Sequence, residues 1–265
     1  MTSEYRHAKW RFRRVASKFS LLALVPGASR RRHACFGWRT HNTTMPNCSA
    51  ISTLPRVLLT GFDAFGGESI NPSWLAVQPL HGRRLANHLI VAAKLPTVFN
   101  VSLLELARLM RLHKPALVIC VGQAGGRAAL SLERIAINVN DARITDNANA
   151  QPVDTPVIPG APAAYFSTLP IKSMLQSLER EGIPAEISQT AGTFVCNHVF
   201  YGLMHQLATR PNLKRTRGGF IHVPYMLGQD HPGMSLENLT RGLRLATRTA
   251  LVTQHDAAYG AGTVS

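Results

Sequence analysis

The chain has 265 residues, 45% of them hydrophobic, and a formal net charge of +15. This composition excludes a disordered protein and allows one large domain with a buried core. Residues 1–55 hold ten Lys or Arg and one acid, so they carry +9 of the total. The remainder is only mildly basic and lacks a basic stripe interleaved with aromatic residues, so nucleic acid is not an expected partner.

Residues 1–55 show no sustained hydrophobic periodicity. The apolar run 21–25 is shorter than the core of a signal peptide, which needs about 7–15 residues. We expect an extension outside the fold with Met45 as the true first residue, and an Arg-rich transit peptide is the alternative. The predicted organisation is an extension over 1–55, a folded domain over 56–254 and a tail over 255–265. No apolar run reaches about 18 residues, so we expect no membrane partner.

From residue 56 onward, short apolar runs alternate with stretches of helical spacing. The runs with the length and composition of buried strands are 57–61, 89–95, 116–121, 134–140, 185–188 and 219–223. The stretches expected to be helical are 73–78, 100–113, 171–181, 195–209 and 236–253. Gly182 is placed to end one of these helices. The alternation predicts a single-domain α/β/α sandwich around a twisted, mixed, largely parallel sheet.

The cysteines include one candidate nucleophile. There are four cysteines without a CxxC pair, so neither a zinc site nor a disulfide scaffold is expected, and we infer a reducing compartment. Cys120 lies in an apolar run and is expected to be a buried strand residue. Cys196 follows a turn of small residues near the start of a predicted helix, where the helix dipole lowers a thiol pKa and free N–H groups can stabilise an oxyanion. A structural cysteine packed on the sheet is the alternative.

A thiolate nucleophile needs a base within reach. His198 is two positions from Cys196, about 200° around a helix, so we expect it to be a packing or surface residue. His222 is a polar residue in an apolar strand, and Glu133 precedes a predicted strand and can orient an imidazole. Taken alone, His222 is equally a hydrogen-bonded core residue, and Glu133 equally half of a surface ion pair.

Four longer segments, taken in order, carry a family resemblance. They are 59–67 (LTGFDAFGG) with Asn71-Pro72-Ser73, 122–138 (GQAGGRAALSLERIAIN), 183–197 (IPAEISQTAGTFVCN) and 220–225 (FIHVPY). Together these segments resemble the type I pyroglutamyl peptidases, also called pyrrolidone-carboxylate peptidases, over residues from about 56 to about 253. Several long motifs in the same order are not expected by chance.

The resemblance implies a cytoplasmic, homotetrameric cysteine peptidase that removes pyroglutamate (5-oxoproline) from peptide N-termini without metal or organic cofactor. It implies Cys196 as nucleophile, His222 as base and Glu133 as third partner, with Arg143 near the oxyanion. The residues implied to form the pyroglutamate pocket are Phe62, Phe65, Asn71, Gln123, Phe194 and Val195. Aromatic walls with a few polar groups suit a flat, mostly apolar lactam.

The chain departs from the family pattern in two places. Residues 1–55 have no counterpart, and Met226-Leu227-Gly228-Gln229 stands where the family usually has Leu-Pro-Glu-Gln. We expect the altered loop to affect subunit contacts or leaving-peptide preference. Two alternatives stay open: a nucleoside phosphorylase-like enzyme of similar fold, which needs a phosphate site, and a basic non-catalytic binding module. The glycine-rich segment 122–126 lacks the spacing of known phosphate-binding loops.

Overall fold

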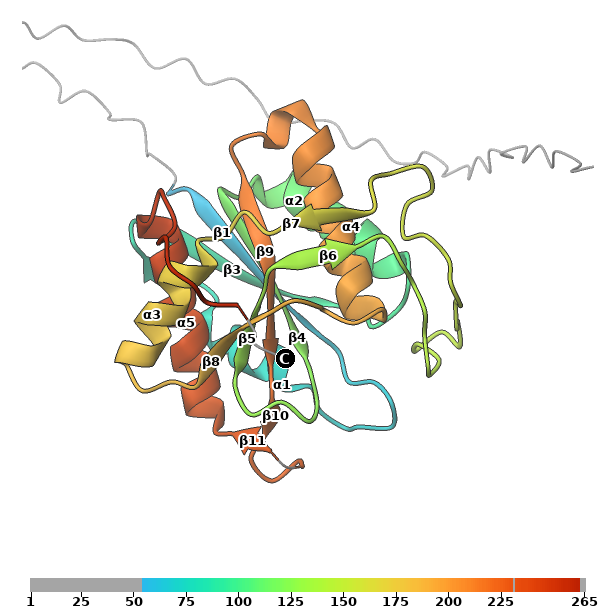
Figure 1. The fold of residues 1–265 in the computed structure, drawn as a ribbon, viewed down its shortest axis with the longest axis horizontal. Coiled ribbons are helices and arrows are strands. Elements are labelled where there is room, and N and C mark those ends of the chain that lie inside the picture. The colour runs from blue at the N-terminus through green and yellow to red at the C-terminus, as the bar shows by residue number, and fades with distance from the viewer. Residues whose placement is uncertain (1–53, 231, 263–265) are drawn as a thin grey trace, which may run out of the picture. The chain divides into compact units, whose positions relative to one another are not determined.

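A seven-stranded sheet lies at the centre of the domain in the computed structural model, which describes residues 54–230 and 232–262 (Figure 1). In order across the sheet the strands are β2 (Arg84–Leu85), β3 (His88–Leu95), β1 (Arg56–Phe62), β4 (Leu117–Gln123), β9 (Arg217–Val223), β5 (Leu130–Glu133) and β8 (Ala185–Ser188). Strands β3, β1, β4 and β9 are parallel, whereas β5 runs antiparallel to β9 and parallel to β8. The predicted mixed, largely parallel α/β sheet is confirmed.

Helices cover both faces of this sheet (Figure 1). One face packs against α1 (Pro72–Val77), α3 (Ile171–Arg180) and α5 (Leu236–Val252), and the other against α2 (Val101–His113) and α4 (Val195–Thr209). Successive strand residues alternate between the two cores. In β9, Ile221 and Val223 belong to the α1/α3/α5 core, and Phe220 belongs to the α2/α4 core. His222 therefore faces the same side as Phe220, toward α4.

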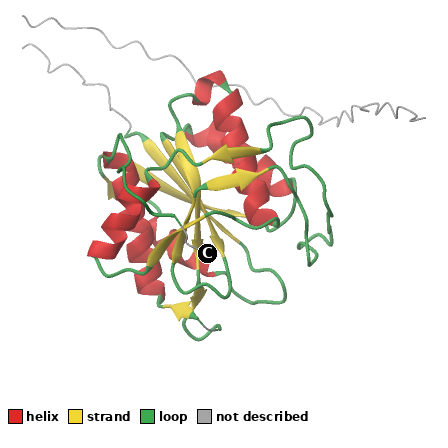
Figure 2. Ribbon diagram, viewed as in Figure 1, coloured by secondary structure: helices red, strands yellow, loops and turns green. Residues whose placement is uncertain are grey.

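Two small sheets and a long loop lie outside the central sheet. Strands β6 (Ile135–Ile137) and β7 (Ala164–Phe166) pair antiparallel, and β10 (Tyr225–Met226) pairs with β11 (Gly233–Met234). Two 3₁₀ turns, η1 (Gln78–Leu80) and η2 (Pro211–Leu213), complete the described elements. The loop over 138–163 contains no helix and only an isolated bridge between Asn140 and Thr155 (Figure 2).

The largest error of the sequence interpretation concerns the predicted strand 134–140. Glu133 ends β5 in the central sheet, and the chain then leaves that sheet to form the short β6 against β7. Glu133 thus ends a strand, whereas the sequence placed it at the start of one. Strands β2, β7, β10 and β11 escaped prediction because runs of two or three residues are too short to show periodicity, and the four-residue β5 escaped it as well.

Other local expectations hold. Cys120 is fully buried in β4, and Gly182 follows α3 with a φ of 68°, a left-handed conformation that favours glycine. The predicted extension 1–55 falls, except for residues 54 and 55, outside the described part of the chain. Within the described ranges, no helix is long and apolar enough to span a bilayer.

Candidate active site

The register between β5 and β9 brings Glu133 to His222. Ser131 pairs with His222 and Glu133 pairs with Phe220, so Glu133 and His222 are diagonal neighbours on one face of the sheet. His222 Nδ1 lies 2.7 Å from Glu133 Oε1, and the two side chains are 4% and 0% exposed. Because Nδ1 donates to the carboxylate, Nε2 of a neutral imidazole is left free to accept a proton. The alternative of a surface ion pair is wrong for Glu133, since its side chain is fully buried.

Cys196 is the second residue of α4, and α4 is anchored to β6. Asn197 Oδ1 accepts from the backbone N–H of Ile137 at 3.0 Å, and its Nδ2 donates to the carbonyls of Ile137 and Val139. The N-cap residue Phe194 makes no side-chain capping hydrogen bond. The first N–H groups of α4 therefore stay available beside the Cys196 thiol.

Gly122 allows this thiol to approach the sheet. Gly122 ends the apolar part of β4 and pairs directly with His222 of β9. A Cβ atom on Gly122 would lie 2.7 Å from Cys196 Sγ and 2.8 Å from Phe220 Cζ, closer than real contacts allow. The sulfur thus lies over the residue adjacent to His222. The fold brings Cys196, His222 and Glu133, here called the candidate triad, to one place.

The charge state of Cys196 differs from the sequence expectation. The helix N-terminus predicts a lowered thiol pKa, but burial, followed by the Glu133 charge, raises the pKa of Cys196 to about 12, against an opposing effect of Arg127. Desolvation disfavours the charged thiolate and is the largest cause of this rise. The resting thiol is therefore neutral, and it becomes a nucleophile by passing its proton to a neighbouring base.

Sequence reasoning missed Arg127, which lies in the loop between β4 and β5. Its Nη1 is 2.8 Å from Glu133 Oε1, the same oxygen that His222 contacts. In the sequence, Arg127 stands six positions before Glu133, next to a glycine-rich segment. This position does not reveal which residues its side chain contacts.

The predicted pocket residues line two separate cavities. Phe62 and Asn71 line one of about 330 Å³. Phe194 and Arg143 line another of about 390 Å³. Phe65 links them: it follows Ala64 of the first cavity, and its ring centroid lies 6.0 Å from that of Phe194.

Asn71, Gln123 and Val195 are engaged in hydrogen bonds or packing within the fold. Asn71 Oδ1 caps α1 through the N–H of Ser73 at 3.0 Å, and Asn71 Nδ2 donates to the Asp63 carbonyl at 2.9 Å. Gln123 ends β4 and accepts from Gln229 Nε2 at 3.3 Å, so the altered loop contacts a predicted lactam-binding residue. Val195 is fully buried. The substrate contacts of these residues stay predictions.

His198 is buried in a hydrogen-bond network behind the pocket. Its Nδ1 donates to Asn140 Oδ1 at 2.9 Å, and its Nε2 accepts from the Asn100 N–H at 3.0 Å. Its ring lies 5.2 Å from that of Phe99, which in turn lies 5.4 Å from that of Phe194. Both ring nitrogens are occupied, so His198 is a packing residue that supports Phe194.

This network predicts a specific loss of stability in acid. Burial lowers the pKa of His198 from 6.5 to about 4, so between these values the unfolded chain binds a proton that the folded protein does not. Stability is therefore complete above pH 6.5 and falls as the pH drops, by about 2 kcal/mol at pH 5. We expect His198→Gln to lose less stability than the unmodified protein between pH 7 and pH 5. Urea unfolding at both pH values measures this, and equal losses in the two proteins would contradict it.

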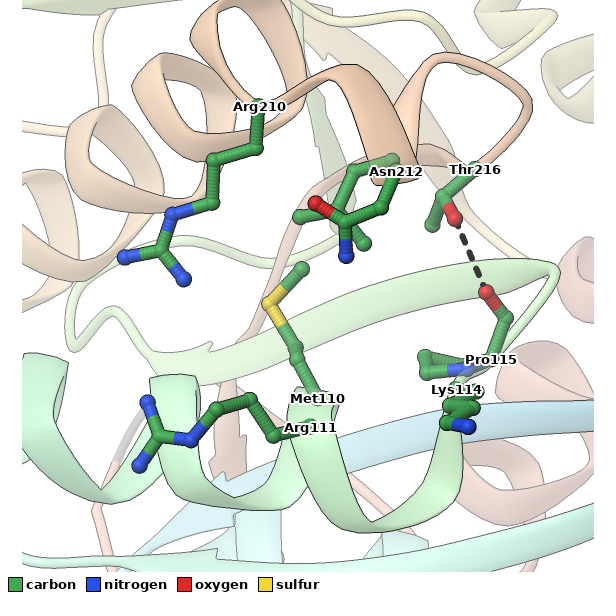
Figure 3. A pocket seen from close by; sticks show the side chains of 8 residues that line it. Met110, Arg111, Lys114, Pro115, Arg210, Asn212 and Thr216 are labelled. Atoms are coloured by element: carbon green, nitrogen blue, oxygen red, sulfur yellow. Dashed lines mark hydrogen bonds between the residues drawn. The ribbon is translucent and has the colours of Figure 1, made fainter.

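A third cavity, of about 370 Å³, lies near the amino ends of β4 and β9, at the opposite end of these strands from Gln123 and His222 (Figure 3). It is lined by the end of α2 and the segment after α4, with the exposed side chains of Arg111 and Arg210 extending on the same side. These segments lead into the first residues of β4 and β9, whereas Gln123 and His222 lie near the last. Ligands of open α/β sheets bind beyond the carboxyl ends of strands, so this cavity is not the candidate active site.

Comparison with known proteins identifies a family for this chain. The family model described as pyroglutamyl peptidase matches residues 55–253. The pyrrolidone-carboxylate peptidase of Cupriavidus taiwanensis is 57% identical over 208 residues, covering 77% of this chain and 96% of the relative. That of Bacillus cytotoxicus is 50% identical over 212 residues, covering 78% and 98%.

Solved structures give the same result. The crystal structure of pyroglutamyl peptidase I from Bacillus amyloliquefaciens aligns with a TM-score of 0.74 at 49% identity, covering 77% of this chain and all 100% of that one. A mutant pyrrolidone carboxyl peptidase from Pyrococcus furiosus aligns with a TM-score of 0.71 at 42% identity, covering 74% and 98%. With the fold, the matched residues and the relatives in agreement, this chain belongs to the pyroglutamyl peptidase family.

Proposed function

We propose that the chain hydrolyses the amide bond between an N-terminal pyroglutamate and the following residue of peptides and proteins. The observation that carries the proposal is the convergence of a buried Glu133–His222 pair and the Cys196 sulfur on one face of the sheet. Family membership supports the same reaction. It does not favour the two alternatives, a nucleoside phosphorylase-like enzyme and a basic non-catalytic binding module.

The proposed mechanism assigns one role to each member of the candidate triad. His222 Nε2 takes the Cys196 proton, and Sγ attacks the carbonyl carbon of pyroglutamate. Glu133 holds the imidazole and stabilises its charged form. N–H groups at the start of α4, with Arg143, stabilise the oxyanion, and one such donor contributes roughly 10²–10³-fold to the rate.

The second half of the reaction regenerates the thiol. His222 donates its proton to the leaving amine as the carbon–nitrogen bond breaks, which leaves a thioester on Cys196. Water then attacks the thioester, with His222 again as base, and releases pyroglutamate. Side chains and water supply every step, so no metal or organic cofactor is required.

We propose that the lactam ring packs against the apolar faces of Phe65 and Phe194, whose ring centroids lie 6.0 Å apart, with Gln123 bonding its polar edge. The partners are N-terminally pyroglutamylated peptides, and we extend the proposal to a cytoplasmic homotetramer on the family resemblance. Two neighbouring aromatic rings present an apolar surface on which one face of a planar five-membered ring can pack.

The test is hydrolysis of a fluorogenic pyroglutamyl amide before and after treatment with iodoacetamide. We expect turnover that disappears in proportion to alkylation of Cys196, followed by mass spectrometry. Turnover that persists with Cys196 fully alkylated, or no turnover by the untreated protein, would contradict the proposal.

A further inference from the structure

The two oxygens of the buried Glu133 carboxylate differ in their hydrogen-bond partners. Its side chain is fully buried, yet only Oε1 is bonded, by both His222 and Arg127. Oε2 has no hydrogen-bond partner among the described residues. A buried carboxylate is stable only when other groups compensate its lost hydration. Because His222 is charged only during part of the proposed cycle, a permanent cation has to compensate Glu133 at the other stages.

Arg127 meets that requirement and also contacts the segment before Cys196. Its Nη2 donates to the Thr190 carbonyl at 3.1 Å, while Nη1 contacts Glu133 at 2.8 Å. Thr190 lies in the turn that leads from β8 into α4, whose second residue is Cys196. The guanidinium side chain is 26% exposed, so solvent screens it less than a surface arginine. The planar guanidinium of Arg127 thus connects Glu133 to the turn that precedes Cys196.

We propose that Arg127 is a positioning residue of the active site, which holds the Glu133 carboxylate against His222 and fixes the turn before Cys196. The inference rests on the proposed function and adds a fourth side chain to it. A lysine cannot replace this arginine fully, because one ammonium on a flexible stem does not reproduce two N–H groups in a rigid plane.

The proposal has an electrostatic consequence for Cys196. The ionisable groups around the thiol are Glu133 on β5, Arg127 in the β4–β5 loop, Cys120 on β4 and His222 on β9. Arg127 lowers the pKa of Cys196, in opposition to burial and to Glu133. Without Arg127 the thiol pKa rises further, so thiolate formation and turnover both require a higher pH. A loss of folding stability alone does not produce this shift.

The chain offers a matched control for the loss of an arginine–carboxylate pair. Arg108 contacts Glu105 at 2.7 Å on the exposed surface of α2, where the two side chains are 55% and 30% exposed. Arg108→Met removes a pair of similar length away from the candidate triad. An exposed pair of this kind contributes little to stability, so this variant is expected to behave as the unmodified protein.

The experiment compares Arg127→Met, Arg127→Lys and Arg108→Met with the unmodified full chain. The first readout is the rate at which iodoacetamide alkylates Cys196 between about pH 6 and pH 10, followed by mass spectrometry on the Cys196 peptide. The second is kcat and KM for a pyroglutamyl amide over the same range. Melting temperatures identify variants that do not fold, and the more conservative Arg127→Lys keeps the test available if Arg127→Met is one of them.

We expect Arg127→Met to alkylate several-fold more slowly near neutral pH, because the thiol pKa rises when Arg127 is absent. Its kcat should fall and recover partly at higher pH, while KM changes by less than about twofold because Arg127 contacts Glu133 and Thr190, not the proposed lactam site. The alkylation rate and kcat of Arg127→Lys should lie between those of Arg127→Met and those of the unmodified protein. An Arg127→Met alkylation profile equal to that of Arg108→Met, or an effect confined to KM, would overturn the inference. If the unmodified chain cleaves no pyroglutamyl amide, the proposed function fails, and the alkylation profiles still decide the role of Arg127.

Discussion

Cys196→Ala is expected to lose nearly all hydrolysis of pyroglutamyl amides while the protein still folds. Removal of the nucleophile of a catalytic triad typically lowers kcat by at least about 10⁴-fold, since the remaining groups cannot form the covalent intermediate. Alanine is smaller than cysteine, so it fits over Gly122, where an added Cβ would meet Cys196 Sγ at 2.7 Å. Steady-state kinetics and a melting curve of the same preparation measure both parts of the result.

The matched control for this variant is Cys120→Ala. Cys120 lies in the neighbouring strand β4, and burial raises its pKa to about 12, as it does for Cys196. Unlike the partly exposed Cys196, it is fully buried, and it has no assigned role. We expect Cys120→Ala to lose some stability through a small cavity and to keep its kcat. Cys196→Ser should be nearly as inactive as Cys196→Ala. Substantial turnover by Cys196→Ala would exclude a thiolate mechanism.

The second large effect is discrimination among amides. We expect cleavage of pyroglutamyl amides and almost none of prolyl, glutamyl or glutaminyl amides. The amine of pyroglutamate is part of a neutral lactam, whereas the other three carry a charged ammonium. Placing that charge against the rings of Phe65 and Phe194 without a carboxylate partner costs several kcal/mol. Proline also lacks the ring carbonyl, and leaving the partner of that group unpaired can reduce kcat/KM by about 10⁴-fold.

The measurement is kcat/KM for the four amides at one pH, repeated with Phe65→Ala. The ring centroid of Phe65 lies 6.0 Å from that of Phe194, and among the described residues Phe65 makes no hydrogen bond or aromatic ring contact with the candidate triad. Its truncation should therefore raise KM strongly and leave the pH profile unchanged. Comparable turnover of the prolyl amide by the unmodified protein would show that these rings do not form a lactam site.

Local pattern was sufficient for most of the fold and for the identity of the candidate nucleophile. Strand 185–188 and helix 195–209 appear in the structure with the predicted bounds, because each has a hydrophobic period or length that its own residues encode. The turn of small residues before Cys196 likewise marks a helix start without tertiary information. The residues alone left His222 open as a core histidine and Glu133 open as half of a surface ion pair. The resemblance favoured their catalytic roles and added the pocket residues as candidates.

The tertiary structure decided how these residues interact. Glu133 and His222 meet across 89 residues of chain because β5 runs antiparallel to β9, a register that no local period encodes. Arg127 reaches Thr190, which follows β8, across 63 residues of chain, and no local pattern encodes this contact. The raised pKa of Cys196 also depends on the tertiary structure, since its main causes are burial and the charge of Glu133, which is distant in sequence. Residue types and periods therefore determined the elements and the candidate groups, and strand register and burial determined their partners and protonation.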